Sequence, residues 1–124
     1  MINIININTD KTTYPNYYYI GRPSILSNPY TYLDVEKTLA LFQCSDREET
    51  IEKYSEYFDI MYGHNKEFTD IVDEIFEKYK NGEEIYLGCF CKPKTCHGDV
   101  IKKKLEERLI KEKIKAIHER NGRQ

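Results

Sequence analysis

The chain has 124 residues, of which 40% are hydrophobic and 32% charged, and its formal net charge is −2. This length allows one domain with a core of its own, and the composition excludes a disordered chain. Because non-specific binding to duplex nucleic acid depends on clustered Lys and Arg, the charge balance argues against a generic duplex-binding protein. The N-terminal segment alternates apolar and polar residues, unlike a secretory signal, and no run reaches transmembrane length. We therefore expect one domain over residues 1–124, no membrane partner and a cytoplasmic location.

The first half of the chain predicts short elements and a long loop. Strands are expected over residues 2–7 and 17–20, with a polar turn between them. The segment 21–32 is rich in Gly, Pro, Ser and Asn and predicts a loop. Loops of this length in compact domains are often functional. A short helix is predicted over residues 34–42, where Val35, Leu39 and Phe42 share one helical face.

The second half predicts longer elements. Ser45 and Glu48 match a helical capping box, and the helix that follows ends at Gly63. A second helix covers residues 66–80, and residues 84–91 read as a strand that is apolar on both faces and therefore central. The last helix starts at His97 or Gly98 and ends in a charged helical tail over about 111–124. This order predicts the α/β class, as a small three-layer sandwich whose central sheet is flanked by helices, with a strand-loop-helix site.

The segment 87–99, here called the Cys–His loop, concentrates the reactive side chains of the chain. These are three thiols, one imidazole and two amines: Cys89, Cys91, Cys96, His97, Lys92 and Lys94. Ligands of open α/β sheets bind beyond the carboxyl ends of the strands. The helix that follows the loop offers unpaired N–H groups and the positive end of its dipole. The loop therefore predicts a site for a phosphate or carboxylate.

Three interpretations of the thiols stay open. The three thiols and His97 could hold zinc, but C-x-C and an adjacent Cys-His pair depart from the C-x₂₋₄-C spacing of structural zinc sites. We therefore predict no metal ligands and no cofactor, with zinc as the alternative. A lysine-rich helix N-terminus could instead activate Cys91 or Cys96 as a nucleophile, with His97 as acid or base. For Cys89 we favour burial as a small hydrophobe.

Four blocks of sequence occur in order along the chain. They are YIGRPS at residues 19–24, LSNPY at 26–30, the segment 47–54 that starts with Arg-Glu-Glu, and LGCFCKP with CHGDVI within 87–101. Together these blocks resemble the family named domain of unknown function 4326, which occurs widely in phages and bacteria. The resemblance covers about residues 18–105. Ser27 stands where the family usually has glycine, and Phe90 where it often has tryptophan.

The resemblance implies that the loop 21–32 and the Cys–His loop belong to one pocket with tyrosine walls. The ligand-binding residues predicted from both arguments are Arg22, Ser24, Asn28, Arg47, Lys92, Lys94, Cys96, His97, Gly98 and Asp99. If the site turns its ligand over, the predicted catalytic residues are Cys91, Cys96 and His97. Arg47 lies in the first turn of a helix, where its charge opposes the dipole, so we expect it to have an anionic partner such as a ligand phosphate.

Such a pocket suits a phosphorylated molecule that contains a ring, of the nucleotide-like or ADP-ribose-like class. A phage-encoded protein of this kind could sequester a signalling nucleotide of host defence, without turnover, in the host cytoplasm. One alternative is a hydrolase or transferase that uses Cys and His at a nucleotide or N-glycosidic bond. A second alternative is a zinc-stabilised interaction module.

Overall fold

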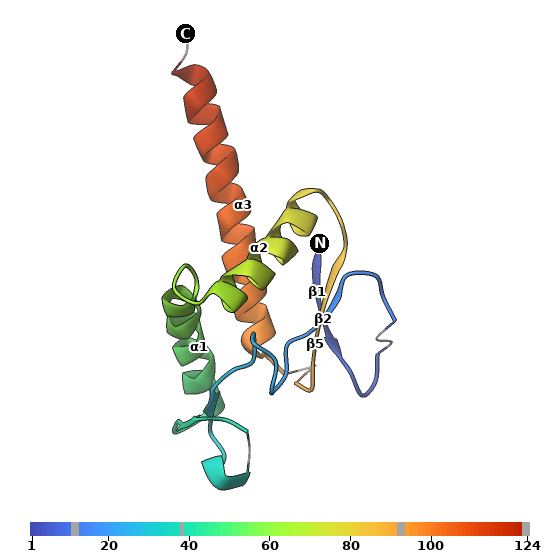
Figure 1. Ribbon diagram of the computed structural model, residues 1–124, viewed down its shortest axis with the longest axis vertical. Coiled ribbons are helices and arrows are strands. Elements are labelled where there is room, and N and C mark those ends of the chain that lie inside the picture. Colours follow the sequence, from blue (N-terminus) through green and yellow to red (C-terminus); the bar gives the residue numbers. More distant parts are fainter. Residues whose placement is uncertain (11–12, 38, 92–93, 123–124) are drawn as a thin grey trace.

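The computed structural model describes residues 1–10, 13–37, 39–91 and 94–122. Its elements in chain order are β1 (Ile2–Asn6), β2 (Tyr17–Tyr19), β3 (Tyr30–Thr31), the 3-10 turn η1 (Val35–Lys37), β4 (Phe42–Gln43), α1 (Arg47–Met61), α2 (Lys66–Lys80), β5 (Ile85–Cys89) and α3 (His97–Asn121). The predicted α/β class is confirmed (Figure 1). No helix in the described part of the chain is both long and apolar enough to cross a membrane.

The main sheet has three parallel strands in the order β1-β5-β2, so β5 is central, as its apolar sequence predicts. In the register of this sheet Leu87 of β5 lies between Ile4 of β1 and Tyr18 of β2. Parallel strands end at the same edge of a sheet. The segments that follow β2 and β5, which are the long loop and the Cys–His loop, therefore start side by side.

All three described α-helices lie on the same side of the sheet (Figure 1), and Leu87 of β5 belongs to the buried core that they share with it. Gly98 of α3 packs against Ile4, and the Tyr18 hydroxyl donates to Glu74 of α2 at 2.7 Å. The core between sheet and helices consists of buried side chains: Ile2, Ile20, Leu26, Tyr54, Phe58, Phe68, Val72, Ile75, Phe76, Ile85, Leu87, Cys89, Cys96, Ile101 and Leu105. Burial of this apolar area is the main force that holds the helices on the sheet.

Tyrosines cover the opposite face of the sheet. Tyr14 stacks on Tyr86 with 3.9 Å between ring centroids, and the ring of Tyr17 lies over Gly88. The side chains that cover this face thus come from the connection between β1 and β2 and from β2 itself, whereas helices cover the other face. Both faces of β5 are therefore shielded from water.

The predicted capping box at Ser45 and Glu48 is wrong by one residue. The N-cap of α1 is Asp46, whose Oδ1 accepts a hydrogen bond from the backbone N–H of Glu49 at 2.8 Å. Ser45 Oγ instead donates to the Glu49 carboxylate at 2.8 Å. Asp is as favourable as Ser at this position, and its charge also complements the helix dipole. Arg47 is consequently the first residue of α1.

The helix predicted over residues 34–42 is also wrong. The chain there makes the single turn η1, and then β4 pairs in parallel with β3. The N–H of Cys44 donates to Thr31 O at 2.6 Å, and that of Leu41 donates to Pro29 O at 2.8 Å. Leu39 and Leu41 are 69% and 72% exposed, so the apolar side chains of this segment do not pack against a core as the predicted helix would require. The unpaired backbone groups of the 29–31 segment offer hydrogen bonds instead.

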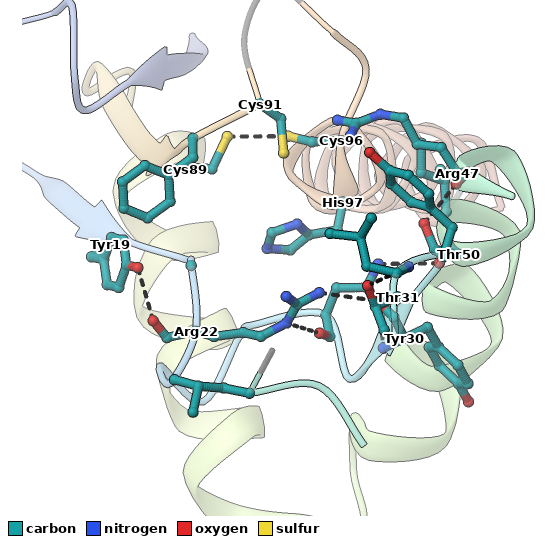
Figure 2. Close-up of a pocket in the computed structure, with 17 residues that line it drawn as sticks. Tyr19, Arg22, Tyr30, Thr31, Arg47, Thr50, Cys89, Cys91, Cys96 and His97 are labelled. Atoms are coloured by element: carbon teal, nitrogen blue, oxygen red, sulfur yellow. Dashed lines mark hydrogen bonds between the residues drawn. The ribbon is translucent and has the colours of Figure 1, made fainter. Parts of the chain in front are cut away.

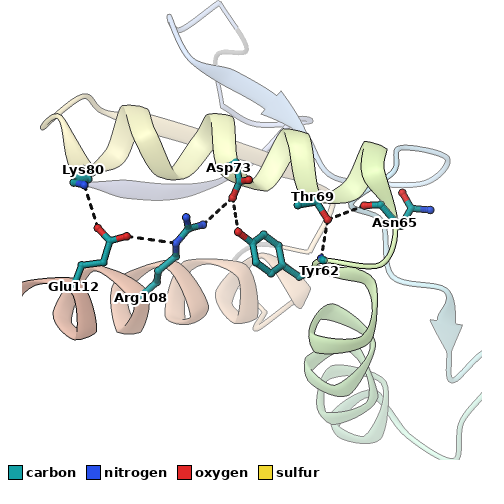
Figure 3. Close-up of polar contacts among 8 residues, drawn as sticks. Tyr62, Asn65, Thr69, Asp73, Lys80, Arg108 and Glu112 are labelled. Carbon is teal, nitrogen blue, oxygen red and sulfur yellow. Dashed lines mark hydrogen bonds and ion pairs between the residues drawn. The ribbon is translucent and has the colours of Figure 1, made fainter. Parts of the chain in front are cut away.

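α3 begins at His97, as predicted, and continues to Asn121, so it includes the described part of the predicted charged tail. It extends beyond the rest of the molecule at its C-terminal end (Figure 1). Ion pairs between side chains of the two helices hold α3 against α2. Arg108 lies 2.9 Å from Asp73, and Lys80 lies 3.1 Å from Glu112 (Figure 3).

Candidate functional site

A pocket of about 450 Å³ opens where β2 and β5 end (Figure 2). Its walls come from the long loop, from the segment around β3, from the first turns of α1 and from the Cys–His loop. The lining residues are Tyr19, Gly21, Arg22, Asn28, Tyr30, Thr31, Tyr32, Leu33, Leu39, Arg47, Thr50, Ile51, Cys89, Phe90, Cys91, Cys96 and His97. The volume falls within the range of small-molecule sites, about 300–1,000 Å³.

The structure brings six of the predicted residues to this pocket: Arg22, Asn28, Arg47, Cys91, Cys96 and His97. The two loops therefore share one pocket, as the resemblance implied. Four other predicted residues do not line it: Ser24, Lys94, Gly98 and Asp99. Lys92 lies outside the described residues.

Those four residues have other structural roles or positions. Ser24 lies in a turn, where its backbone N–H donates a hydrogen bond to Gly21 O at 2.9 Å, and the Lys94 side chain is exposed. Gly98 lets α3 approach the sheet closely. The Asp99 carboxylate accepts the N–H of Cys96 at 2.9 Å and completes the capping box of α3.

Arg22 is half-buried and points into the pocket (Figure 2). Its Nε donates to Asn28 O at 2.9 Å and its Nη2 to Tyr30 O at 3.1 Å. Burial lowers the pKa of the guanidinium, which nevertheless stays charged in proteins. Arg22 forms no ion pair with any described carboxylate, so its charge stays uncompensated by acid.

Arg47 reaches from α1 to the Cys–His loop. Its Nε and Nη2 donate to Thr95 O at 3.0 and 2.8 Å, so this carbonyl is the partner that the unfavourable helix position required. Burial lowers the pKa of this guanidinium, but its interactions with Cys91 and Tyr32 outweigh burial and raise the pKa. Within the described residues Arg47, like Arg22, has no carboxylate partner.

Asn28 holds the long loop against α1. Its Nδ2 donates to Thr50 O at 3.2 Å, and its Oδ1 accepts the N–H of Tyr30 at 3.0 Å. The side chain is buried, with both polar atoms bonded. We conclude that Asn28 positions the backbone carbonyls that in turn hold Arg22.

His97 is 7% exposed, and its Nε2 lies 2.7 Å from Ile20 O. Because a carbonyl accepts only, Nε2 carries the proton and Nδ1 keeps a lone pair, with no hydrogen bond to a described residue. Burial lowers the pKa of the ring, which favours the neutral form. Tyr54 meets the ring edge-on at 5.0 Å and fixes its orientation. His97 forms no hydrogen bond with any described thiol, so the predicted acid–base pair with Cys91 is not hydrogen-bonded in the structure.

The thiols of Cys89, Cys91 and Cys96 form a cluster in which the sulfur atoms lie within 4.8 Å of one another. The Sγ atoms of Cys89 and Cys96 are 3.3 Å apart. The pKa of Cys91 lies far below its usual value because the two neighbouring thiols donate to it and the Arg47 guanidinium is close, effects that outweigh its burial. The pKa of Cys96 is raised, since its thiol donates to the other two. These three cysteines could hold a metal ion.

The family model described as domain of unknown function (DUF4326) matches residues 5–107. The chain belongs to the DUF4326 family. The match starts in β1, well before the residues near position 18 where the resemblance begins, and it contains every residue that lines the pocket. No characterised protein and no solved structure matches the chain.

Sequence reasoning missed several residues of this DUF4326 pocket. Thr50 follows Arg47 by three positions and so shares its helical face, a spacing that could have identified it. Leu33 and Leu39 gave no such signal, because they reach the pocket only through the pairing of β3 with β4. Cys89 was assigned to the core. It is buried, but it also lines the pocket.

Proposed function

We propose that this DUF4326 protein binds a small anion that carries both a phosphate group and a planar ring, in the class of nucleotides and ADP-ribose. One observation carries the proposal. Arg22 and Arg47 line the same pocket, and no Asp or Glu is among the described residues that line it. Guanidinium groups bind phosphate through paired N–H donors, and the attraction is strongest where water is scarce. An anionic ligand would supply the negative charge that no described carboxylate of the pocket lining supplies.

The pocket also offers hydrogen-bonding groups of both kinds. The guanidinium groups supply donors, whereas His97 supplies the lone pair of Nδ1 as an acceptor. A ligand with phosphate acceptors at one end and hydroxyl or amine donors elsewhere satisfies both. Ribose phosphates have this combination, and inorganic phosphate at neutral pH has much less of it.

The mouth of the pocket supports the ring. Tyr32, Leu33, Leu39 and Phe90 line the pocket yet are 42%, 50%, 69% and 55% exposed. We call these four side chains the apolar rim. A planar ring that covers the rim would remove apolar surface from water, worth about 25 cal/mol per Å². The rim therefore favours a nucleotide over a bare anion.

The proposal extends to binding without turnover. The described pocket lining contains no carboxylate pair for general acid–base chemistry. A phage-encoded protein with such a pocket would lower the free concentration of a signalling nucleotide of host defence in the host cytoplasm. Ligand recovered unchanged after heat denaturation would support sequestration, and a new product would support the hydrolase or transferase alternative.

The direct test is a thermal-shift and calorimetric screen. The panel contains nucleoside mono-, di- and triphosphates, cyclic nucleotides, ADP-ribose and inorganic phosphate. A ligand at 100 times its dissociation constant adds about 2.7 kcal/mol to the free energy of unfolding, which is a clear rise in Tm. If no member of the panel raises the Tm or releases heat, the proposed function is wrong.

A matched pair of variants tests the rim. Leu39 and Leu41 have similar exposure and lie two residues apart, but only Leu39 lines the pocket. Leu39→Ala should weaken binding of the best nucleotide several-fold and leave inorganic phosphate unaffected. Leu41→Ala should change neither. Equal effects of the two substitutions would show that the ring does not use the rim.

A further inference from the structure

We propose that Cys89, Cys91 and Cys96 bind one soft divalent metal ion, Zn²⁺ above all, and leave a fourth coordination position open to the pocket. The metal site stands on the geometry of the thiol cluster alone. Only its use, direct coordination of the anionic group of a ligand, rests on the proposed function.

The spacing of the sulfur atoms fits a tetrahedral ion. Zn–S bonds of about 2.3 Å at tetrahedral angles place sulfur atoms roughly 3.8 Å apart. In the structure all three Sγ atoms lie within 4.8 Å of one another, and the closest pair is at 3.3 Å. Small side-chain rotations of Cys89, Cys91 and Cys96 are therefore enough to close three bonds on one ion.

The backbone holds the three thiols from separate places. Cys89 is the last residue of the central strand β5, and Cys96 is the N-cap of α3. Cys91 lies between them at the start of the loop. The packing of α3 against β5 brings the C-x-C pair and the later cysteine together. The sequence spacing that is typical of zinc fingers does not predict a site of this kind. Such positions are more rigid than a site built on one loop.

Charges around the cluster suit three thiolates and a divalent cation, which together carry one negative charge. Arg47 and Arg22 both lie close enough to Cys91 to interact with it electrostatically. The N–H of Gly98 donates to Cys96 Sγ at 3.3 Å. Hydrogen bonds and cations of this kind orient thiolate ligands and balance their charge. Each thiol that is protonated releases its proton to solvent as the metal–sulfur bond forms, with no change of oxidation state.

The fourth position faces the ligand pocket. Within the described residues no additional His, Cys, Asp or Glu atom joins the cluster of three sulfurs. All three cysteines line the pocket. Zinc sites with three protein ligands keep water or substrate in the fourth position, whereas structural zinc sites use four. The arrangement therefore favours an ion that binds water and exchanges it for an anion.

The test uses the full chain, first treated with reductant and chelator, and then titrated with Zn²⁺ and with Co²⁺. We expect one ion per chain, with thiolate-to-cobalt charge-transfer absorption. Addition of inorganic phosphate should shift the cobalt spectrum, since phosphate enters the fourth position. No metal binding, or binding without thiolate-to-cobalt absorption, would overturn the metal site. An unchanged spectrum with phosphate would overturn the open position.

Three serine variants locate the ion. Cys96→Ser removes a ligand but keeps a favourable N-cap, so α3 should remain folded. Cys91→Ser removes the half-buried ligand, and both variants should lose more than the roughly 100-fold in metal affinity that second-shell changes cost. Cys44→Ser is the control, because Cys44 is a buried thiol outside the cluster and should leave metal binding unchanged. Full affinity in Cys91→Ser and Cys96→Ser would contradict the assignment.

The outcomes for the metal and for the proposed function are separable. If metal-free protein binds AMP and never takes up Zn²⁺, the metal site is wrong and the proposed function stands. If Zn²⁺ binds but neither form binds any member of the panel, the proposed function is wrong and the metal site stands. If Zn²⁺ raises the affinity for AMP, both hold.

Discussion

Arg47, the first residue of α1, donates two hydrogen bonds to the carbonyl oxygen of Thr95, the residue before the N-cap of α3. This contact links the beginnings of two helices that both border the pocket. It also gives the charge of Arg47, which opposes the dipole of its own helix, a negative partial charge to face. The partner predicted from the sequence was a ligand phosphate. The structure shows that the free protein already supplies a partner.

Arg47→Ala should therefore destabilise the free protein by about 0.5–1.5 kcal/mol, the usual net contribution of a hydrogen bond, since the exposed Thr95 carbonyl can bind water instead. Arg47→Lys should restore only part of this loss, because an amine cannot reproduce the planar pair of donors. Urea unfolding of the three proteins measures the effect. If Arg47→Ala loses affinity for phosphate but keeps the stability of the wild type, the hydrogen bonds to Thr95 do not contribute to the free energy of unfolding.

Tyr54→Phe should be more costly. The Tyr54 hydroxyl is buried and donates to Leu26 O at 2.7 Å, so the substitution leaves a buried carbonyl without its partner. We expect a loss of about 1–3 kcal/mol in the free energy of unfolding. Tyr79→Phe is the control, because the Tyr79 hydroxyl makes no hydrogen bond to a described residue. A similar loss in both variants would mean that the ring environment, and not the bond to Leu26, explains the result.

The elements that the sequence predicts well are those with long, regular patterns. α2 repeats its apolar residues over four turns, and β5 is apolar on both faces, so tertiary contacts reinforce the local preference. The start of α3 at His97 was also predicted, but its N-cap Cys96 was not, because cysteine is not among the residues that usually cap a helix. For α1 two adjacent residues, Ser45 and Asp46, are equally suitable caps, and local sequence could not choose between them.

The parts that could not be predicted depend on contacts between distant residues. The helical spacing of Leu39 and Phe42 gives no indication that β4 will pair with β3. Strand alternation places Cys89 and Cys91 on one face but says nothing about where the loop returns Cys96. The thiol cluster, and with it the candidate metal site, is visible only once the loop between β5 and α3 is seen.

Gly88→Ala tests the close packing on the tyrosine face of the sheet. A methyl group on Gly88 would lie 2.6 Å from the Tyr17 ring and 2.8 Å from Cγ2 of Ile7, so these side chains must move. Overpacking of this kind costs about 1–3 kcal/mol. In a Tyr17→Ala background the penalty of Gly88→Ala should be smaller, because one of the two obstacles is gone. Chemical denaturation of the four proteins of this cycle gives the coupling, and a coupling of zero would contradict the contact.

The last prediction concerns Asp73, which joins α2 to α3. Burial alone would raise the pKa of this carboxyl, but hydrogen bonds from Tyr62 and Arg108 outweigh burial and hold the pKa below its ordinary value of 3.8 (Figure 3). A carboxyl whose pKa is lower in the folded state adds stability above its unfolded pKa and loses it as the pH falls through the folded value. The network should therefore stabilise the protein at neutral pH and fade below about pH 4.

Asp73→Asn should consequently lower the free energy of unfolding at pH 7, and the difference from wild type should shrink as the pH falls below about 4. Because the Asp73 side chain is 44% exposed, solvent screening limits the loss to about 1 kcal/mol or less, and added salt should reduce it further. Asp70→Asn is the matched control on the same helix, since the pair of Asp70 with Lys66 is far more exposed and should contribute almost nothing. Urea unfolding between about pH 3 and pH 7 measures both variants. A difference for Asp73→Asn that stays constant over this range would show that the ionised carboxylate is not what holds α2 and α3 together.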